Sequence, residues 1–186
     1  MYPVSDAFLR AVRSNTRKYF WTGTIVTKGG MTYEFGAKEI VKGSGYISRQ
    51  CCGSTEIELG TVYAAEMGIT LLSDIDRYTL EDALVTLVFH LVLADGSVED
   101  VPMGVFEVSE ANRLAKCLEL KAYDFMLRFD KSFNGFETVG TAYDFITLCC
   151  KRCKVEFANK RAEIDAMPNG GVTLSVYTEN DIETCR

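Results

Sequence analysis

The sequence predicts an α+β protein that is mainly β, with antiparallel strands followed by a small helical and β annex. Residues 84–93 alternate between an apolar and a mixed face, which is the period of a half-buried strand. Gly29-Gly30 and Asp95-Gly96 supply turns that let strands reverse on themselves. After Asp124 the composition changes, and residues 140–157 space their apolar side chains as a helix does.

The first half of the chain opens with a short amphipathic helix. Residues 5–16 begin with Ser5, a residue favoured at helix N-caps, and place Phe8, Leu9 and Val12 on one face. The next elements are expected in this order: a strand at 18–28, its hairpin partner at 31–35, a loop at 37–45, a strand at 46–52, a polar bridge at 53–60 and a strand at 62–72.

A charged turn at 73–83 leads into the strand at 84–93. Its apolar face, expected in the core, carries Val85, Leu87, Phe89, Leu91 and Leu93. Pro102 is expected at the entrance of a short following strand, where a missing N–H is tolerated, and Gly104 leaves room for a bulge. A second turn then leads to a strand at 117–123 with one wet and one dry side.

Together these segments give about six or seven strands in the first 124 residues, which favours a small antiparallel barrel or a pair of packed sheets. The remaining residues predict a small α/β annex. It comprises a linker with a short helix at 123–133, a helix at 140–157, a turn at Pro168–Gly171 and a strand at 172–177. Residues 180–186 read as the start of a further helix, which leads us to expect a fragment of a longer protein.

The composition limits the classes of function. The 186 residues are 47% hydrophobic and 25% charged, as in an ordinary globular protein. A net charge of −6, with Lys and Arg scattered singly, argues against wrapping of nucleic acid, which needs a basic stripe. The sequence has no run of 18 apolar residues and no signal-peptide pattern at its start, so we expect synthesis in a cytoplasm and no membrane partner.

The seven cysteines are an odd number for a disulfide framework. Cys150 and Cys153 form a C-x-x-C pair, which raises metal and redox alternatives. A structural zinc site needs four ligands, and a thioredoxin-like motif should open a helix rather than lie late in one. We therefore expect free, buried or half-buried thiols, with no metal and no cofactor.

Two further groups of residues have a simple structural interpretation. His90, the single histidine, lies on the mixed face of a strand without a partner motif, so we expect it to be packed or solvated rather than catalytic. Asp74, Asp76, Glu81 and Asp82 lack the spacing of a calcium loop and predict a solvated turn.

Several segments follow one another along the chain in a distinctive order: GTIVTKGGMTYEF, EIELGTVYAAEMGITL, the VPMGVF run at residues 101–106, the LKAYD ending at residues 120–124, the helical annex and MPNG. In this order they resemble the N-terminal domain of phage and prophage tail-hub proteins, also known as baseplate hub or tail-associated lysin proteins. The similarity runs over nearly the whole chain.

The resemblance implies an antiparallel split β-barrel of the phage tail-hub type at 1–130, a tail-tube-like domain. It makes 131–186 the start of a smaller inserted α/β domain, truncated here. Proteins of this family form a homotrimeric ring that connects the six-fold tail tube to the three-fold distal tip, and DNA passes through the lumen without specific binding. The implied location is the virion tail, and any peptidoglycan hydrolase would lie in a C-terminal region absent from these residues.

The resemblance also implies surfaces for subunit contact, for which we predict Tyr19, Trp21 and His90. Aromatic side chains are frequent in subunit contacts, although Tyr19 and Trp21 also fit a core. We predict no catalytic residue. Two alternatives remain: a Cys-dependent enzyme, which lacks a neighbouring base, and a carbohydrate- or peptide-binding β module, which needs an exposed aromatic platform or an open sheet edge.

Overall fold

The computed structural model describes residues 2–50, 63–131 and 138–176. The chain divides into two compact units, the first formed by Met1–Gln50 with Ala64–Asp124 and the second by Phe125–Arg186 with Cys51–Tyr63. The first unit contains a large sheet and the helix α1. The second contains two helices and a two-stranded sheet.

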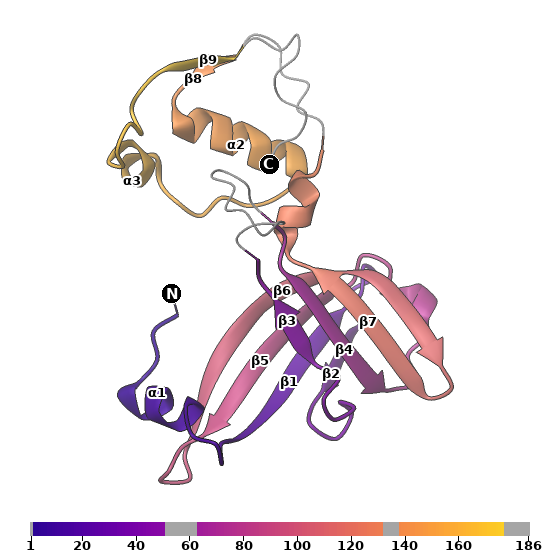
Figure 1. Ribbon diagram of the computed structural model, residues 1–186. Helices are drawn as coiled ribbons and strands as arrows, with labels where there is room; N and C mark the ends of the chain where they lie inside the picture. The colour runs from indigo at the N-terminus through magenta and orange to yellow at the C-terminus, as the bar shows by residue number, and fades with distance from the viewer. Residues whose placement is uncertain (1, 51–62, 132–137, 177–186) are drawn as a thin grey trace. The chain divides into compact units, whose positions relative to one another are not determined.

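A seven-stranded antiparallel sheet forms the first unit, in the order β2-β1-β5-β6-β7-β4-β3 (Figure 1). Every neighbouring pair is antiparallel, which confirms the mainly β prediction. The strands are β1 Lys18–Val26, β2 Thr32–Phe35, β3 Tyr46–Ser48, β4 Glu66–Leu72, β5 Leu84–Val92, β6 Val98–Leu114 and β7 Cys117–Tyr123.

The core lies on one face of this sheet, hereafter the inner face. On β5 the predicted face is the inner one, and Val85, Leu87 and Leu91 are buried. Phe89 and Leu93, expected in the core with them, are half-buried. For Phe89 the reason is that it borders a cavity at the end of the sheet where β1 begins.

β6 is one strand of 17 residues, so the prediction of a short strand opening at Pro102 was wrong. Leu87 pairs with Gly104 and Val88 with Pro102, which makes Met103 the extra residue of a bulge. A second irregularity follows Val108. Each extra residue exchanges the two faces of the strand, so Val101, then Phe106, then Ala111 all point to the core face although their spacing is not regular.

The sheet is strongly curved, and the segment after β2 links the β2 edge of the sheet to β4 (Figure 1). This segment, predicted as a loop, forms an isolated bridge between Ile40 and Leu71 of β4. The Val41 amide donates to the Thr70 carbonyl at 2.9 Å, and the Leu72 amide donates to the Glu39 carbonyl at 2.6 Å. β3 pairs only with Glu66–Gly68, the first residues of β4. The later residues on that edge of β4 are therefore available for this bridge.

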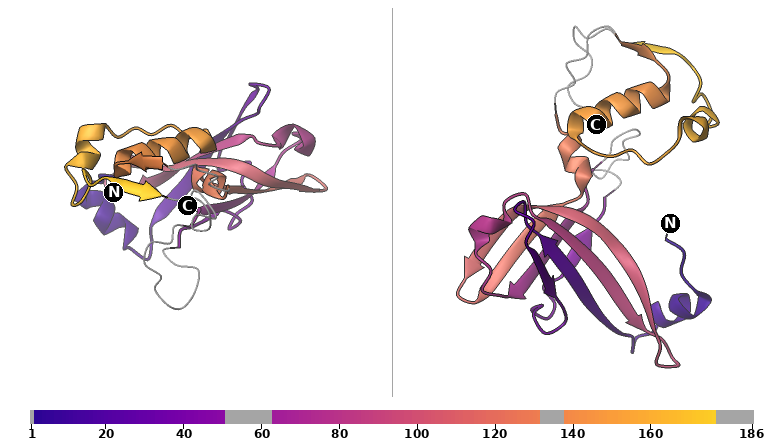
Figure 2. Two further views of the ribbon diagram at one scale, coloured as in Figure 1. Left: turned by 90° about the horizontal axis from the view of Figure 1, so that it is seen from above. Right: turned by 180° about the vertical axis from the view of Figure 1, so that it is seen from behind.

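Helix α1, Asp6–Val12, begins at the predicted cap. The Ser5 hydroxyl accepts from the Phe8 amide at 3.0 Å, and the Ser5 amide donates to the Glu99 carboxylate on β6 at 2.8 Å. The helix lies beside the end of the sheet at which β1 begins (Figure 2). Ser5 therefore both starts the helix and fixes it to the sheet.

The charged turn before β5 contains the 3₁₀ helix η1, Arg77–Leu80, capped by the Asp76 side chain. Its four predicted carboxylates are exposed, as expected of a solvated turn, while Leu80 and Ala83 are fully buried and anchor it. The strand predicted at 46–52 is shorter in the part that the structure describes, ending at Ser48. The bridge predicted at 53–60 and the helix start predicted at 180–186 lie outside the described residues.

The second unit consists of the 3₁₀ helix η2 Phe125–Phe129, β8 Thr138–Gly140, α2 Ala142–Cys153, α3 Arg161–Asp165 and β9 Leu174–Val176. The helix predicted at 140–157 and the short helix in the linker are therefore confirmed, while α3 and β8 were not predicted. The small core centres on Cys153, with Phe129, Phe145, Cys149 and Val155 packed around it. In the described part of the chain, no helix has the length and apolar character needed to span a membrane.

Candidate functional site

The three predicted contact residues lie on β1 and β5 but on opposite faces of the sheet. Tyr19 and Trp21 share the inner face of β1 with the core residue Ile25, and Tyr19 is 53% exposed. His90 lies on the outer face of β5, opposite Phe20, and its side chain is 13% exposed. Only Tyr19 and Trp21 are brought together.

The inner-face aromatics gather around Phe89. Its ring lies 5.4 Å from that of Tyr19, 5.8 Å from that of Trp21 and 6.4 Å from that of Phe8 on α1. The edge-to-face geometry of the Trp21 and Phe8 contacts is a favourable one for aromatic pairs. The Tyr19, Trp21 and Phe89 rings border a cavity of about 450 Å³, the inner cavity, lined by Val12, Arg17, Tyr19, Trp21, Ile40, Gly43, Gly45, Ile69 and Phe89.

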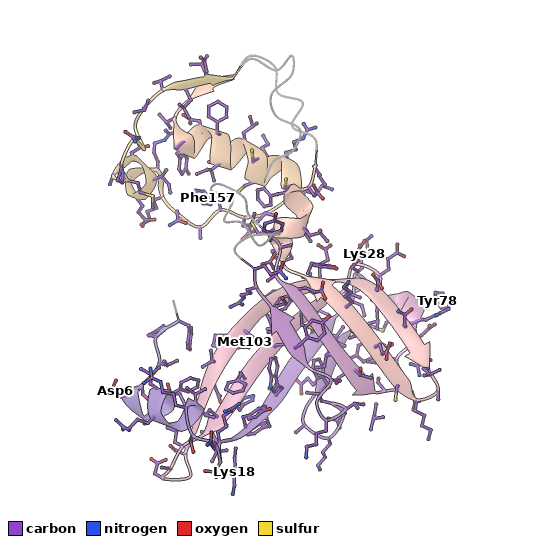
Figure 3. All side chains as sticks on the ribbon, viewed as in Figure 1. Asp6, Lys18, Lys28, Tyr78, Met103 and Phe157 are labelled. Atoms are coloured by element: carbon purple, nitrogen blue, oxygen red, sulfur yellow. The ribbon has the colours of Figure 1, made fainter. Side chains whose placement is uncertain are left out.

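The inner cavity lies beside a half of β1 that is paired on one side only. β5 pairs with β1 over its whole length, whereas β2 pairs only with Gly23–Val26. We call Lys18–Thr22 the open half of β1 (Lys18 is labelled in Figure 3). Within the described residues no strand pairs with its other side.

β2 ends there because the chain turns away at Gly36. The amides of Glu39 and Ile40 both donate to the Gly36 carbonyl at 3.1 Å, and the Gly36 amide donates to the Glu39 carboxylate at 2.9 Å. The chain therefore forms a tight turn here instead of continuing β2 alongside β1. On the outer face this turn borders a cleft of about 460 Å³, the outer cleft, lined by Thr22, Gly23, Thr24, Glu34, Phe35, Gly36, Glu39 and Val88.

His90 is held by a hydrogen-bonded chain that crosses three strands. Its Nε2 lies 2.7 Å from the Thr22 hydroxyl on β1, and its Nδ1 lies 2.5 Å from the Asp100 carboxylate on β6. The Phe20 ring stacks on the imidazole with centroids 4.5 Å apart. The sequence analysis missed Thr22 and Asp100, because only the strand register brings them to His90.

The order hydroxyl, imidazole, carboxylate is that of a nucleophile, its base and the group that orients the base. Acyl transfer also requires donors aimed at a developing oxyanion. Thr22 instead faces the outer cleft, to which Glu34 and Glu39 contribute carboxylates, and negative charge there destabilises an oxyanion. The arrangement therefore suits a polar clamp that joins β1, β5 and β6.

A second polar group lies on β3, β4 and β7. The Tyr46 hydroxyl donates to the Glu66 carboxylate at 2.5 Å, and the Lys121 ammonium lies 3.5 Å from the other Glu66 oxygen. The hydrogen bond from Tyr46 lowers the pKa of Glu66, and the same bond raises the pKa of Tyr46. The Tyr46 ring lies over Gly68, directly opposite in the register, where it occupies the space of a side chain.

The cysteines of the described residues, Cys117, Cys149, Cys150 and Cys153, lie outside disulfides. Cys150 and Cys153 are buried and Cys149 is half-buried, as predicted from the helical stripe. Burial raises the pKa of the Cys150 thiol, which lowers its thiolate fraction and its reactivity. Among the residues that the structure describes, no group of three or more His, Cys, Asp or Glu is placed to hold a metal.

Comparison with known proteins gives little similarity in sequence. No family model matches the chain, and no curated protein matches it. A solved structure described as the virion of a native gene transfer agent (GTA) particle contains a chain that is similar in structure, with 11% sequence identity and a TM-score of 0.45. The match covers 71% of this chain and spans about half, 49%, of that one.

Proposed function

We propose that the chain is a structural component of a phage or prophage tail tip, a virion protein whose first unit is one barrel of a hub ring. In this role it connects the tail tube to the distal tip and lines the passage for DNA. The proposal rests on the resemblance of the ordered segments, and on where those segments lie in the fold. Four of them are far apart in the sequence, yet they supply strands of the same sheet.

The position of the segments is the observation that carries the proposal. GTIVTKGGMTYEF is the β1–β2 hairpin, the VPMGVF run is the bulged part of β6, and the LKAYD ending closes β7. β4, which ends the EIELGTVYAAEMGITL segment, pairs with β7. Four of the six segments supply strands of one sheet, and the helical annex and MPNG lie in the second unit. A signature of structural segments is what a structural protein is expected to carry, because its function depends on shape rather than on a catalytic group.

The curvature of the sheet supports a split barrel. The Ile40–Leu71 bridge and its two backbone hydrogen bonds join the segment after β2 to β4, across the space between the sheet's two sides. A sheet joined in this way removes part of its open edge, which is the advantage of a barrel over a flat sheet. We propose that the open half of β1 is the split.

The acidic net charge fits a conduit for DNA, because a wall of like charge does not bind phosphate. Of the predicted contact residues, Tyr19 offers the largest exposed surface, whereas His90 is largely covered by its partners. We propose a homotrimer in the complete gene product, with the tail tube and distal tail proteins as its other partners, and no enzymatic activity in this part of the chain.

The test is to delete the gene in its phage or prophage and to analyse the particles. We expect particles without completed tails, restored by complementation with the complete gene product, and we expect that product in purified tails and as a trimer by native mass spectrometry. Complementation with a Phe106→Ala product of unchanged length is the matched control for folding. Normal tails without the protein, or a complete product that stays monomeric at tens of micromolar and is absent from tails, would contradict the proposal.

A further inference from the structure

The open half of β1 has the features of a site for an added strand. β2 pairs with β1 only from Gly23 to Val26. The preceding residues, Lys18–Thr22, pair with β5 on one side, and no strand of the described residues pairs with their other side. Every second residue of an antiparallel strand turns its N–H and C=O away from a given neighbour. The open half therefore presents backbone donors and acceptors along a line that continues the direction of β2.

The inner cavity gives this edge a place for apolar side chains. Trp21 and Tyr19 point to the inner face, and the cavity that they line is bounded across the gap by Ile40 and Ile69. An added strand would place every second side chain on this face. Its residues opposite Trp21 and Tyr19 would enter the cavity, whose size of about 450 Å³ is that of a site for small ligands or side chains.

On the outer face, the two ends of this edge carry opposite charges. At one end, Glu34 and Glu39 line the outer cleft beside Thr22. At the other end lies the exposed Lys18, which shares the outer face with Thr22, whereas the neighbouring Arg17 lines the inner cavity. A strand that follows the direction of β2 runs antiparallel to β1, so it would begin near the carboxylates and end near Lys18.

We infer that the open half of β1 binds an extended peptide segment of another protein by strand addition. The segment has a basic residue opposite Thr22, apolar residues opposite Trp21 and Tyr19, and an acidic residue opposite Lys18. Main-chain hydrogen bonds give affinity in this mode of recognition, and pockets for alternate side chains give specificity. The inference rests on the geometry of β1 and its two pockets, and does not depend on the proposed tail function.

The pattern gives one probe peptide, acetyl-Lys-Leu-Thr-Val-Glu-Ser-amide, and three control peptides. The first control exchanges Lys and Glu, the second replaces Leu by Ser, and the third is methylated on the backbone nitrogens that would face β1. Binding to the complete 186-residue chain is measured by amide chemical shifts, and hydrogen exchange of Lys18–Thr22 is measured with and without peptide.

We expect the probe to shift and protect amides of Lys18–Thr22. Replacing Leu by Ser should weaken binding roughly tenfold, because burial of that side chain is lost. Exchanging the charges replaces two exposed attractions by two repulsions and should weaken binding at least roughly two- to fivefold, the range of one exposed ion pair. Glu34→Lys should reduce the preference between these two peptides, because Glu39 and Lys18 remain, whereas Glu119→Lys, an exposed carboxylate on β7, should leave it unchanged.

Four outcomes would overturn the inference. Absence of saturable shifts at millimolar probe would exclude the site, and shifts confined to other strands would place binding elsewhere. Equal binding of the methylated peptide would exclude strand addition. Protection of Lys18–Thr22 that rises with protein concentration in the absence of peptide would show that a second copy of the chain covers the edge.

Discussion

The register that the bulges set in β6 predicts that two adjacent residues differ strongly in their contribution to stability. Phe106 is 1% exposed on the inner face, opposite the fully buried Val85, whereas Val105 is 39% exposed on the outer face. A register without the Met103 bulge would exchange these two positions. Phe106→Ala should therefore be costly and Val105→Ala cheap, although both side chains are apolar and are neighbours in the sequence.

The expected losses of unfolding free energy differ between the two variants by a factor of three or more. Phe106→Ala removes a fully buried ring, and loss of such a ring costs about 3–5 kcal/mol in unfolding free energy. Val105→Ala removes part of a largely solvated side chain and should cost under about 1 kcal/mol. With a urea m-value of about 1–3 kcal/mol/M, the first change lowers the midpoint by at least about 1 M.

Trp21 makes the measurement specific to the first unit. It is the single tryptophan of the chain and contacts Phe89 within that unit, so its fluorescence in urea reports the sheet and not α2. If Phe106→Ala does not fold, Phe106→Leu, for which we expect roughly 1–2 kcal/mol, keeps the comparison measurable. Equal effects at the two positions, or a larger effect at Val105, would refute the bulged register.

Three further predictions concern other parts of the fold. Gly68→Ala should displace the Tyr46 ring, since a Cβ would overlap it. We expect a cost of about 1 kcal/mol through the lost hydrogen bond to Glu66, and the raised pKa of Tyr46 should move back toward its ordinary value, measured by absorbance titration. The Arg161 guanidinium beside Asp144 lowers the pKa of that carboxyl to about 2, so its stabilisation of α2 is complete above its ordinary pKa of 3.8 and is lost as pH falls toward 2. α2 amide signals in NMR should show this loss, and Asp144→Asn should remove the dependence. Iodoacetamide should label the buried Cys150 and Cys153 after the half-buried Cys117, as mass spectrometry can follow, and a fast reaction at Cys150 would contradict its burial.

Several elements could be predicted from local patterns because their causes are local. The Ser5 cap, the alternation of β5 and the helical stripe of α2 each follow from side chains a few residues apart. The dry side of β7 was predicted in the same way, and Leu118, Leu120 and Ala122 are buried. In these elements the apolar residues recur at the same spacing as the residues that share one face of the strand or helix.

The sequence by itself therefore determined the mainly β class, most of the strands and the helix of the annex. Only the tertiary structure decided the length of β6, the chain of Thr22, His90 and Asp100, and the open half of β1. These features depend on register and on where a partner strand ends. Gly104 indicated room for a bulge, but only the pairing with β5 shows that Met103 is the extra residue and that β6 continues through it. The end of β2 before Gly36 becomes an open edge only because β1 continues beyond it.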